Sequence, residues 1–141
     1  MPESCPFCNL DGRVLAENGS ALLFLSNPRK VPGHFLVVPK RHVEKPWGML
    51  QTEFEDVMEL VFEAQMFLAE SFPGGGCDVR QNYRPFMKQG RIKIDHVHYH
   101  IYPRSLHDEL YHRVERFETD MFEDLPADEA SQWSELFRSR H

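Results

Sequence analysis

The sequence predicts a single domain of 141 residues that combines a β-sheet with one long helix. Short apolar runs between turn-forming residues are typical of strands, and one longer segment repeats its apolar residues with helical spacing. The expected strands are residues 14–17, 21–25, 34–38, 77–83 and 91–102, and the expected helices are residues 52–72 and 126–137.

Local signals mark the ends of these elements. Asn18-Gly19 joins the first two expected strands, and this dipeptide strongly favours a hairpin turn. Thr52 and Glu55 have the spacing of a capping box at the start of the long helix, and the glycine-rich run 73–76 ends it.

The segment beyond residue 104 alternates acidic and aromatic positions. Pro126 suits the first turn of the second helix. We expect the large apolar residues that precede it to pack onto the domain: Phe117, Met121, Phe122 and Leu125.

Composition excludes several classes of protein. With 41% hydrophobic and 27% charged residues, the chain has the composition of a soluble globular protein. Its formal net charge of −6 argues against general binding to nucleic-acid polymers. No apolar run is long enough to span a bilayer, and residues 1–4 lack the pattern of a signal peptide. We therefore expect a cytoplasmic protein that does not bind membranes.

The most informative stretch is His96-Val97-His98-Tyr99-His100-Ile101-Tyr102. In a β-strand, alternate side chains point to one face at intervals of roughly 6.5–7 Å. The three histidines are therefore expected to share one face, while the apolar residues between them face a core. Histidine is the usual acid–base and metal-binding side chain near neutral pH, which favours a functional role. The alternative is that they form the polar face of an amphipathic strand.

A second motif, Cys5-Pro6-Phe7-Cys8, lies near the N-terminus. Two thiolates at this spacing suit two corners of a tetrahedral zinc site or a redox pair. A redox pair of the thioredoxin kind should follow a strand and open a long helix, whereas Gly12 soon interrupts this segment. Zinc is therefore favoured if two further ligands lie downstream, and two buried cysteines without a ligand are the alternative.

Residues 80–93 contain basic side chains and no acidic one: Arg80, Arg84, Lys88, Arg91 and Lys93. In a chain of net negative charge, this local reversal of sign indicates an anionic ligand. A solvated loop that leads into the outer face of a strand explains the pattern equally well, so both interpretations remain open.

These motifs resemble those of the histidine triad (HIT) family of nucleotide hydrolases and transferases. Three segments carry the resemblance in the expected order: the Cys5–Cys8 motif, which is similar to the zinc-containing branch, residues 33–42 (Gly-His-Phe-Leu-Val-Val-Pro-Lys-Arg-His), and the histidine row with Pro103-Arg104 after it. The resemblance covers residues 5–104 and leaves a C-terminal extension, residues 105–141. It implies one α+β domain with a five-stranded antiparallel sheet and a long helix, which dimerises into a continuous sheet.

The resemblance also implies a reaction at the α-phosphate of a nucleotide phosphoramidate or a dinucleoside polyphosphate. His98 corresponds to the nucleophile, which forms a covalent nucleotidyl-histidine that water then hydrolyses. A neutral imidazole suits this role because it is a good nucleophile at pH 7 and a good leaving group when protonated. His100 and His34 would hold the phosphoryl oxygens as charge shifts in the transition state.

The remaining site residues are implied in the same way. Asn82 matches a family asparagine that contacts the phosphate region. Ser26 stands where an acidic residue commonly binds the ribose hydroxyls, and we assign it to nucleotide binding together with Asn27. The zinc-containing branch implies a structural zinc with a closed ligand set: Cys5, Cys8, His42 and His96.

The segment before the histidines departs from the family pattern. In residues 89–95, Lys93 stands where a hydroxyl side chain is expected, and the interval from Asn82 to His96 is longer than usual. Two alternatives to hydrolysis remain. One is a nucleotidyl transferase or phosphorylase, which typically has glutamine where this chain has His100. The other is a non-catalytic, zinc-stabilised nucleotide-binding module.

Overall fold

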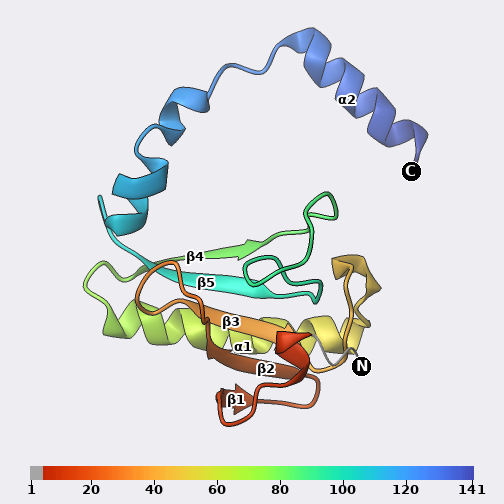
Figure 1. The fold of residues 1–141 in the computed structure, drawn as a ribbon. Helices are drawn as coiled ribbons and strands as arrows, with labels where there is room; N and C mark the ends of the chain where they lie inside the picture. The colour runs from red at the N-terminus through yellow and green to blue at the C-terminus, as the bar shows by residue number, and fades with distance from the viewer. Residues whose placement is uncertain (1–4) are drawn as a thin grey trace.

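The structure is a computed structural model that describes residues 5–141. Residues 1–4, which we predicted to lack a signal peptide, lie outside the described part. The body is a five-stranded antiparallel sheet in the spatial order β1-β2-β3-β5-β4, and α1 packs against β2, β3, β4 and β5 (Figure 1). The strands are β1 (Val14–Glu17), β2 (Ala21–Leu25), β3 (Phe35–Pro39), β4 (Gly76–Gln81) and β5 (Tyr99–Arg104), and the helices are α1 (Gln51–Ser71) and α2 (Ala127–Ser139). The predicted α+β fold is confirmed.

The two faces of the sheet are covered differently, as strand alternation requires. One face packs against α1 and holds the main core, which includes Leu23, Val37 and Ile101 from the sheet and Val57 and Leu60 from the helix. The opposite face carries a smaller cluster of Leu10, Phe24, Leu36 and Val38. Leu36 pairs with His100 across β3 and β5, so this second face also carries the imidazole of His100.

The hairpin and the long helix agree with the prediction, except at the start of the helix. The strands β1 and β2 have the predicted bounds, and the side chain of Asn18 accepts a hydrogen bond from the amide of Ala21 in the turn. Thr52 and Glu55 do not form the capping box. The carboxylate of Glu53 instead accepts the Leu50 amide at 2.8 Å and two hydrogen bonds from Arg41. Because Arg41 fixes that carboxylate at the end of the turn, the helix begins at Gln51.

The last strand is shorter than predicted, and this is the largest error within the body. Pairing with both neighbours begins at Tyr99, so residues 91–98 form a loop instead of the first half of a strand. The amide of Val97 donates to the carbonyl of Val43 at 2.8 Å, which replaces a ladder hydrogen bond. Pro103 does not end the strand, because it still pairs with Cys77 of β4. On its other side, pairing with β3 stops at Ile101, so the missing N–H of proline costs no hydrogen bond to β3.

The C-terminal extension begins on the body and then leaves it. The guanidinium of Arg104 donates to Asp108 at 2.8 Å and to Glu115 at 2.7 Å, and Leu110 is buried against Tyr102. The rest of the chain, which we call the C-terminal arm (residues 116–141), extends away from the sheet and ends in α2 (Figure 1). Among residues 5–141, no helix is long and apolar enough to cross a membrane.

The predicted packing of the arm onto the domain is wrong. The apolar residues expected to pack there are strongly exposed: Phe117 (64%), Met121 (81%), Phe122 (80%) and Leu125 (69%). One face of the sheet is already occupied by α1, and the cavity described below opens on the other. Within residues 5–141, these four side chains therefore stay exposed instead of packing onto the sheet.

Candidate active site

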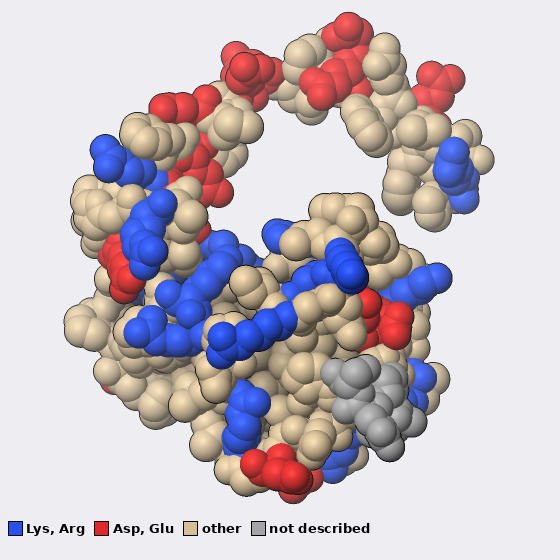
Figure 2. Space-filling view, in the orientation of Figure 1, with Lys and Arg blue, Asp and Glu red and all other residues tan. Residues whose placement is uncertain are grey.

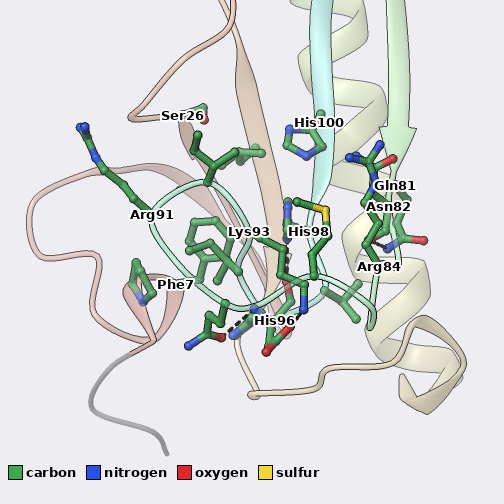
Figure 3. A pocket seen from close by; sticks show the side chains of 18 of the residues that line it. Phe7, Ser26, Gln81, Asn82, Arg84, Arg91, Lys93, His96, His98 and His100 are labelled. Atoms are coloured by element: carbon green, nitrogen blue, oxygen red, sulfur yellow. Dashed lines mark hydrogen bonds and ion pairs between the residues drawn. The ribbon is translucent and has the colours of Figure 1, made fainter.

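The histidine row lies at the N-terminal end of β5 and lines a cavity of about 950 Å³. His96 and His98 belong to the loop before β5, and His100 belongs to the strand itself. Their rings nevertheless follow one another along one face, with the centroids of His98 and His100 4.8 Å apart (Figure 3). His34, directly before β3, brings a fourth imidazole to the same wall. The shared face is confirmed, although His100 is the one histidine of the row that lies on a regular strand.

The first histidine of the row belongs to a separate cluster. One side-chain nitrogen or sulfur from each of Cys5, Cys8, His42 and His96 lies within 4.8 Å of the others. The Nδ1 atom of His96 lies 3.5 Å from the Cys5 sulfur and 3.6 Å from the Cys8 sulfur, and the Nδ1 atom of His42 lies 3.4 Å from the Cys8 sulfur. The four residues assigned to a metal are thus brought together and can bind one.

The spacing of these atoms fits a tetrahedral ion. With Zn–S and Zn–N bonds of about 2.3 and 2.0 Å, sulfur and nitrogen ligands lie about 3.5 Å apart. The second nitrogen of each imidazole is occupied: Nε2 of His96 donates to the carbonyl of Pro39 at 2.8 Å, and Nε2 of His42 donates to the carboxylate of Glu44 at 3.0 Å. Both Nδ1 lone pairs therefore face the cluster, which is the usual arrangement for metal-binding histidine.

The ionisation of the cluster suits metal binding at the histidines and opposes it at the thiols. Burial lowers the pKa of His96 to about 4, so its imidazole is neutral. Burial, followed by the neighbouring thiol of Cys5, raises the pKa of Cys8 to about 11. A metal must therefore displace a thiol proton on binding, which makes the affinity fall as pH falls.

The middle histidine presents a free lone pair to the cavity. Nδ1 of His98 lies 2.7 Å from the carbonyl oxygen of His96. A carbonyl only accepts hydrogen bonds, so Nδ1 carries the proton and Nε2 is unprotonated. Burial lowers the pKa of His98, although the hydrogen bond to the His96 carbonyl partly opposes this. His98 is therefore a neutral imidazole in the tautomer that a nucleophile requires.

The third histidine has the opposite tautomer. The backbone amide of Lys30 donates to Nδ1 of His34 at 3.1 Å, which leaves the proton of the His34 ring on Nε2. That Nε2–H donates to Nδ1 of His100 at 2.9 Å. The proton of His100 is therefore on its own Nε2, where it is a hydrogen-bond donor. The His96 carbonyl thus makes Nε2 of His98 an acceptor, and the Lys30 amide, acting through His34, makes Nε2 of the neighbouring His100 a donor.

The low pKa values of this pair keep the arrangement neutral. Burial, followed by the charge of Lys30, lowers the pKa of His34 to about 4. Burial, followed by the neighbouring imidazoles of His98 and His34, lowers the pKa of His100 to about 3. At pH 7 none of the three rings carries a charge, so each acts through its fixed tautomer.

Sequence reasoning missed a residue that joins the two halves of the site. The ring of Phe7, between the two cysteines, packs edge-on against His98 with centroids 5.1 Å apart and lies 6.0 Å from the ring of His96. In the Cys5–Cys8 motif, the thiols indicate a metal site, and the aromatic side chain of Phe7 between them is the signal for this second role. Folding of the N-terminal segment around the metal cluster therefore also packs a wall against His98.

The nucleotide-binding candidates all line the cavity. Asn82 directly follows β4, while Ser26 and Asn27 follow β2. The hydroxyl of Ser26 donates to the carbonyl of Pro28 at 2.7 Å, so its oxygen presents lone pairs and no hydrogen to a ligand. Lys93, which departs from the family pattern, forms an ion pair with Asp95.

Comparison with known proteins agrees with this geometry. The HIT domain pattern matches residues 9–107. The chain belongs to the HIT family. It is 31% identical over 109 residues to the adenosine 5′-monophosphoramidase of Schizosaccharomyces pombe, covering 72% of this chain and 74% of that protein. It is 30% identical over 91 residues to a bis(5′-adenosyl)-triphosphatase of Dictyostelium discoideum, covering 61% of this chain and 59% of that protein.

Solved structures of the HIT family share the fold. A HIT-family protein from Bacillus subtilis superposes with a TM-score of 0.75 at 23% identity, covering 99% of this chain and 98% of its own. A histidine triad nucleotide-binding protein from Candida albicans gives a TM-score of 0.72 at 22% identity, with coverage of 97% and 96%. Both alignments span almost the whole chain, including most of the C-terminal arm.

Proposed function

We propose that this HIT-family protein is a nucleotide hydrolase that acts at the α-phosphorus through a covalent intermediate on His98. The observation that carries the proposal is the pair of opposite tautomers, with the lone pair of His98 beside the N–H donor of His100. The related proteins named as a monophosphoramidase and a triphosphatase support a nucleotide derivative as the substrate.

In the first step, Nε2 of His98 attacks the α-phosphorus and forms a P–N bond, while the bond from phosphorus to the leaving group breaks. The leaving group takes the bonding electron pair: a phosphate leaves as an anion, whereas an amine also takes a proton from solvent as it leaves. Nε2–H of His100 donates to a phosphoryl oxygen as negative charge accumulates there, and the His34 ring holds His100 in the donor tautomer. The carbonyl of His96 stabilises the positive charge that develops on the His98 ring.

In the second step, a water molecule attacks the same phosphorus and the P–N bond breaks. The imidazole of His98 recovers its electron pair, a proton passes to solvent, and a nucleoside monophosphate is released. Division of one displacement into two lets the same histidine serve first as nucleophile and then as leaving group.

We assign a structural zinc to Cys5, Cys8, His42 and His96, as in the zinc-containing branch of the family. The ligand set is closed, with no position for water, so a bound zinc would supply stability and not chemistry. The effect on the reaction is indirect. Because the carbonyl of His96 orients His98, ligation of the His96 ring fixes the residue that sets the nucleophile's tautomer.

Substrate binding is assigned to the residues around the same cavity. We propose that Asn82 contacts the phosphate region, while Ser26 and Asn27 approach the ribose. Because Ser26 replaces an acidic side chain and its hydroxyl hydrogen is engaged by Pro28, its oxygen can accept one hydrogen bond from a ribose hydroxyl but not a bidentate pair.

A homodimer is part of the proposal. Among residues 5–141, no strand pairs with the outer edge of β4, and pairing of two copies along it would give a continuous sheet. The exposed side of α1 carries apolar side chains that a second copy would cover: Phe54, Phe62, Met66 and Phe67. Cytoplasmic location remains a prediction.

Turnover of a substrate panel tests the function. We expect the protein to release a nucleoside monophosphate from adenosine 5′-phosphoramidate or a dinucleoside polyphosphate, and His98→Ala to abolish the release. His112→Ala is the matched control, because His112 is exposed and does not line the cavity. Product formed only with an added phosphate or alcohol acceptor indicates a transferase. Tight nucleotide binding without any product indicates a binding module, which contradicts the proposal.

A further inference from the structure

The histidine row continues beyond His100 into a ring with two cations beside it. The ring of Tyr102 stacks on His100 with centroids 5.7 Å apart and planes 6° apart. Nζ of Lys30 lies 5.5 Å from the centroid of Tyr102, and Cζ of Arg80 lies 5.1 Å from it. Positive charge is thus gathered at the end of the row that lies away from the metal cluster.

The cations differ in whether the protein neutralises them. Arg80 is paired with Asp78 at 3.1 Å and with Glu115. Lys30 and Arg84, which both line the cavity, form no ion pair with any residue between 5 and 141. Two further basic residues on the cavity wall, Lys88 and Arg91, are in the same situation. Figure 2 shows the basic side chains as a band across this face of the body.

Lys30 and Arg84 line the same cavity, where their like charges oppose one another. Burial and then the charges of Arg80 and Arg84 lower the pKa of Lys30. Crowding of like charges costs free energy in the empty protein, and an anion bound between them recovers it. A neutral ligand cannot do so.

We propose that the side chains of Lys30 and Arg84 form a subsite for the phosphate chain of the leaving group. The substrate class is then a nucleotide with further phosphates beyond the α-phosphate, in preference to a phosphoramidate whose leaving group is an amine. This inference rests on the proposed reaction at His98. The phosphate chain leaves as an anion, with the bonding electron pair on its terminal oxygen. The side chains of Lys30 and Arg84 stabilise this charge without transfer of a proton.

Lys30 has two roles that a substitution can separate. Its backbone amide fixes the tautomer of His34, whereas its side chain carries the charge beside Tyr102. Lys30→Gln removes the charge and keeps the amide. Lys30 and Arg84 are both exposed residues, so glutamine can replace either one without opening a cavity in the core.

The test compares kcat/KM for three substrates: adenosine 5′-phosphoramidate, diadenosine tetraphosphate and ATP. In the double variant Lys30→Gln/Arg84→Gln, we expect kcat/KM for the two polyphosphates to fall by about 10- to 100-fold, as for loss of hydrogen bonds to a charged group. We expect the value for the phosphoramidate to stay within about twofold. Comparison of ATP with diadenosine tetraphosphate shows whether the phosphate chain of the substrate must carry a second nucleoside.

The matched control is Lys40→Gln/Arg138→Gln, which removes the same charge outside the cavity and should leave all three values unchanged. An equal loss for all three substrates in the Lys30/Arg84 variant, or no loss for any, overturns the proposal.

A binding experiment separates this inference from the reaction on which it rests. The His98→Ala protein should bind inorganic tripolyphosphate in a salt-dependent way, and addition of the Lys30 and Arg84 substitutions should abolish that binding. If no substrate is turned over by the wild-type protein, the proposed function fails, and charge-dependent binding of tripolyphosphate still supports the subsite. Binding that is independent of the two residues overturns the subsite, whether or not the phosphoramidate is hydrolysed.

Discussion

The Nε2 atom of His34 lies 2.9 Å from the Nδ1 atom of His100, and this hydrogen bond decides which nitrogen of His100 carries its proton. The chain of donors begins at the backbone amide of Lys30, which cannot reverse its role. His98 is fixed in the opposite tautomer by the carbonyl of His96. The two uncharged imidazoles therefore have different roles: His98 is suited to act as the nucleophile and His100 as the hydrogen-bond donor.

Removal of the His34 ring should release the tautomer of His100. We expect His34→Ala to lower kcat/KM by about 10²-fold, the typical cost of one misplaced transition-state donor, with the fold intact. Steady-state kinetics and circular dichroism of the same sample measure this. His112→Ala provides the control, and a variant that keeps wild-type kcat/KM would remove His34 from the donor chain.

The pH profile should report a nucleophile with a depressed pKa. Burial lowers the pKa of His98, and only the unprotonated ring attacks phosphorus. We therefore expect the acid limb of kcat/KM to have its midpoint below the ordinary histidine value of 6.5. An acid limb with its midpoint at 6.5 or higher would contradict the account.

Stability should change with pH for the same reason. The folded pKa values of His34 and His100, about 4 and about 3, lie below the ordinary 6.5 of an unfolded chain. The unfolded state therefore binds more protons, and the free energy of unfolding decreases as pH falls from about 6.5 towards 4. Denaturant titrations at several pH values measure this decrease, and the His34→Ala variant should show a smaller one.

Removal of the metal should destabilise the N-terminal segment and weaken catalysis together. Purified protein should contain about one zinc per chain, and Cys8→Ala should lose it and lower both Tm and kcat. Cys77→Ala is the matched control, because Cys77 lies on β4 outside the cluster. Metal analysis with thermal melts checks both variants. Equal metal content in the two would exclude the cluster as the binding site.

The C-terminal arm should be covered when two copies associate. Its exposed apolar side chains, such as Phe122 and Trp133, find no partner surface within residues 5–141. We expect light scattering to give a dimer for the full chain and a weaker dimer for a chain that ends at Glu115. A monomer at micromolar concentration would contradict the proposed assembly.

The sequence was sufficient where a local pattern determines the structure. The hairpin β1–β2, the body of α1 and the shared face of the histidines all follow from alternation, helical spacing and a turn dipeptide. The metal cluster came from the resemblance, because residues as distant as Cys5 and His96 meet only through the fold.

The errors arose where a distant contact overrides the local pattern. Arg41 holds Glu53 at the start of α1, which no spacing within the helix indicates. Ile92 and Ile94 continue the alternation of the triad, yet no neighbouring strand reaches them, so they lie in a loop. The tautomers depend on two backbone groups, at Lys30 and His96, whose positions no side-chain pattern reveals.

The covalent intermediate tests the central claim most directly. Rapid-quench mass spectrometry of the intact protein, mixed with a substrate that it turns over, should show a mass increase of one nucleotidyl group. Peptide mapping should place the group on His98, and His98→Ala should show no increase. Turnover with no adduct at any quench time, or an adduct that persists in His98→Ala, would contradict the account.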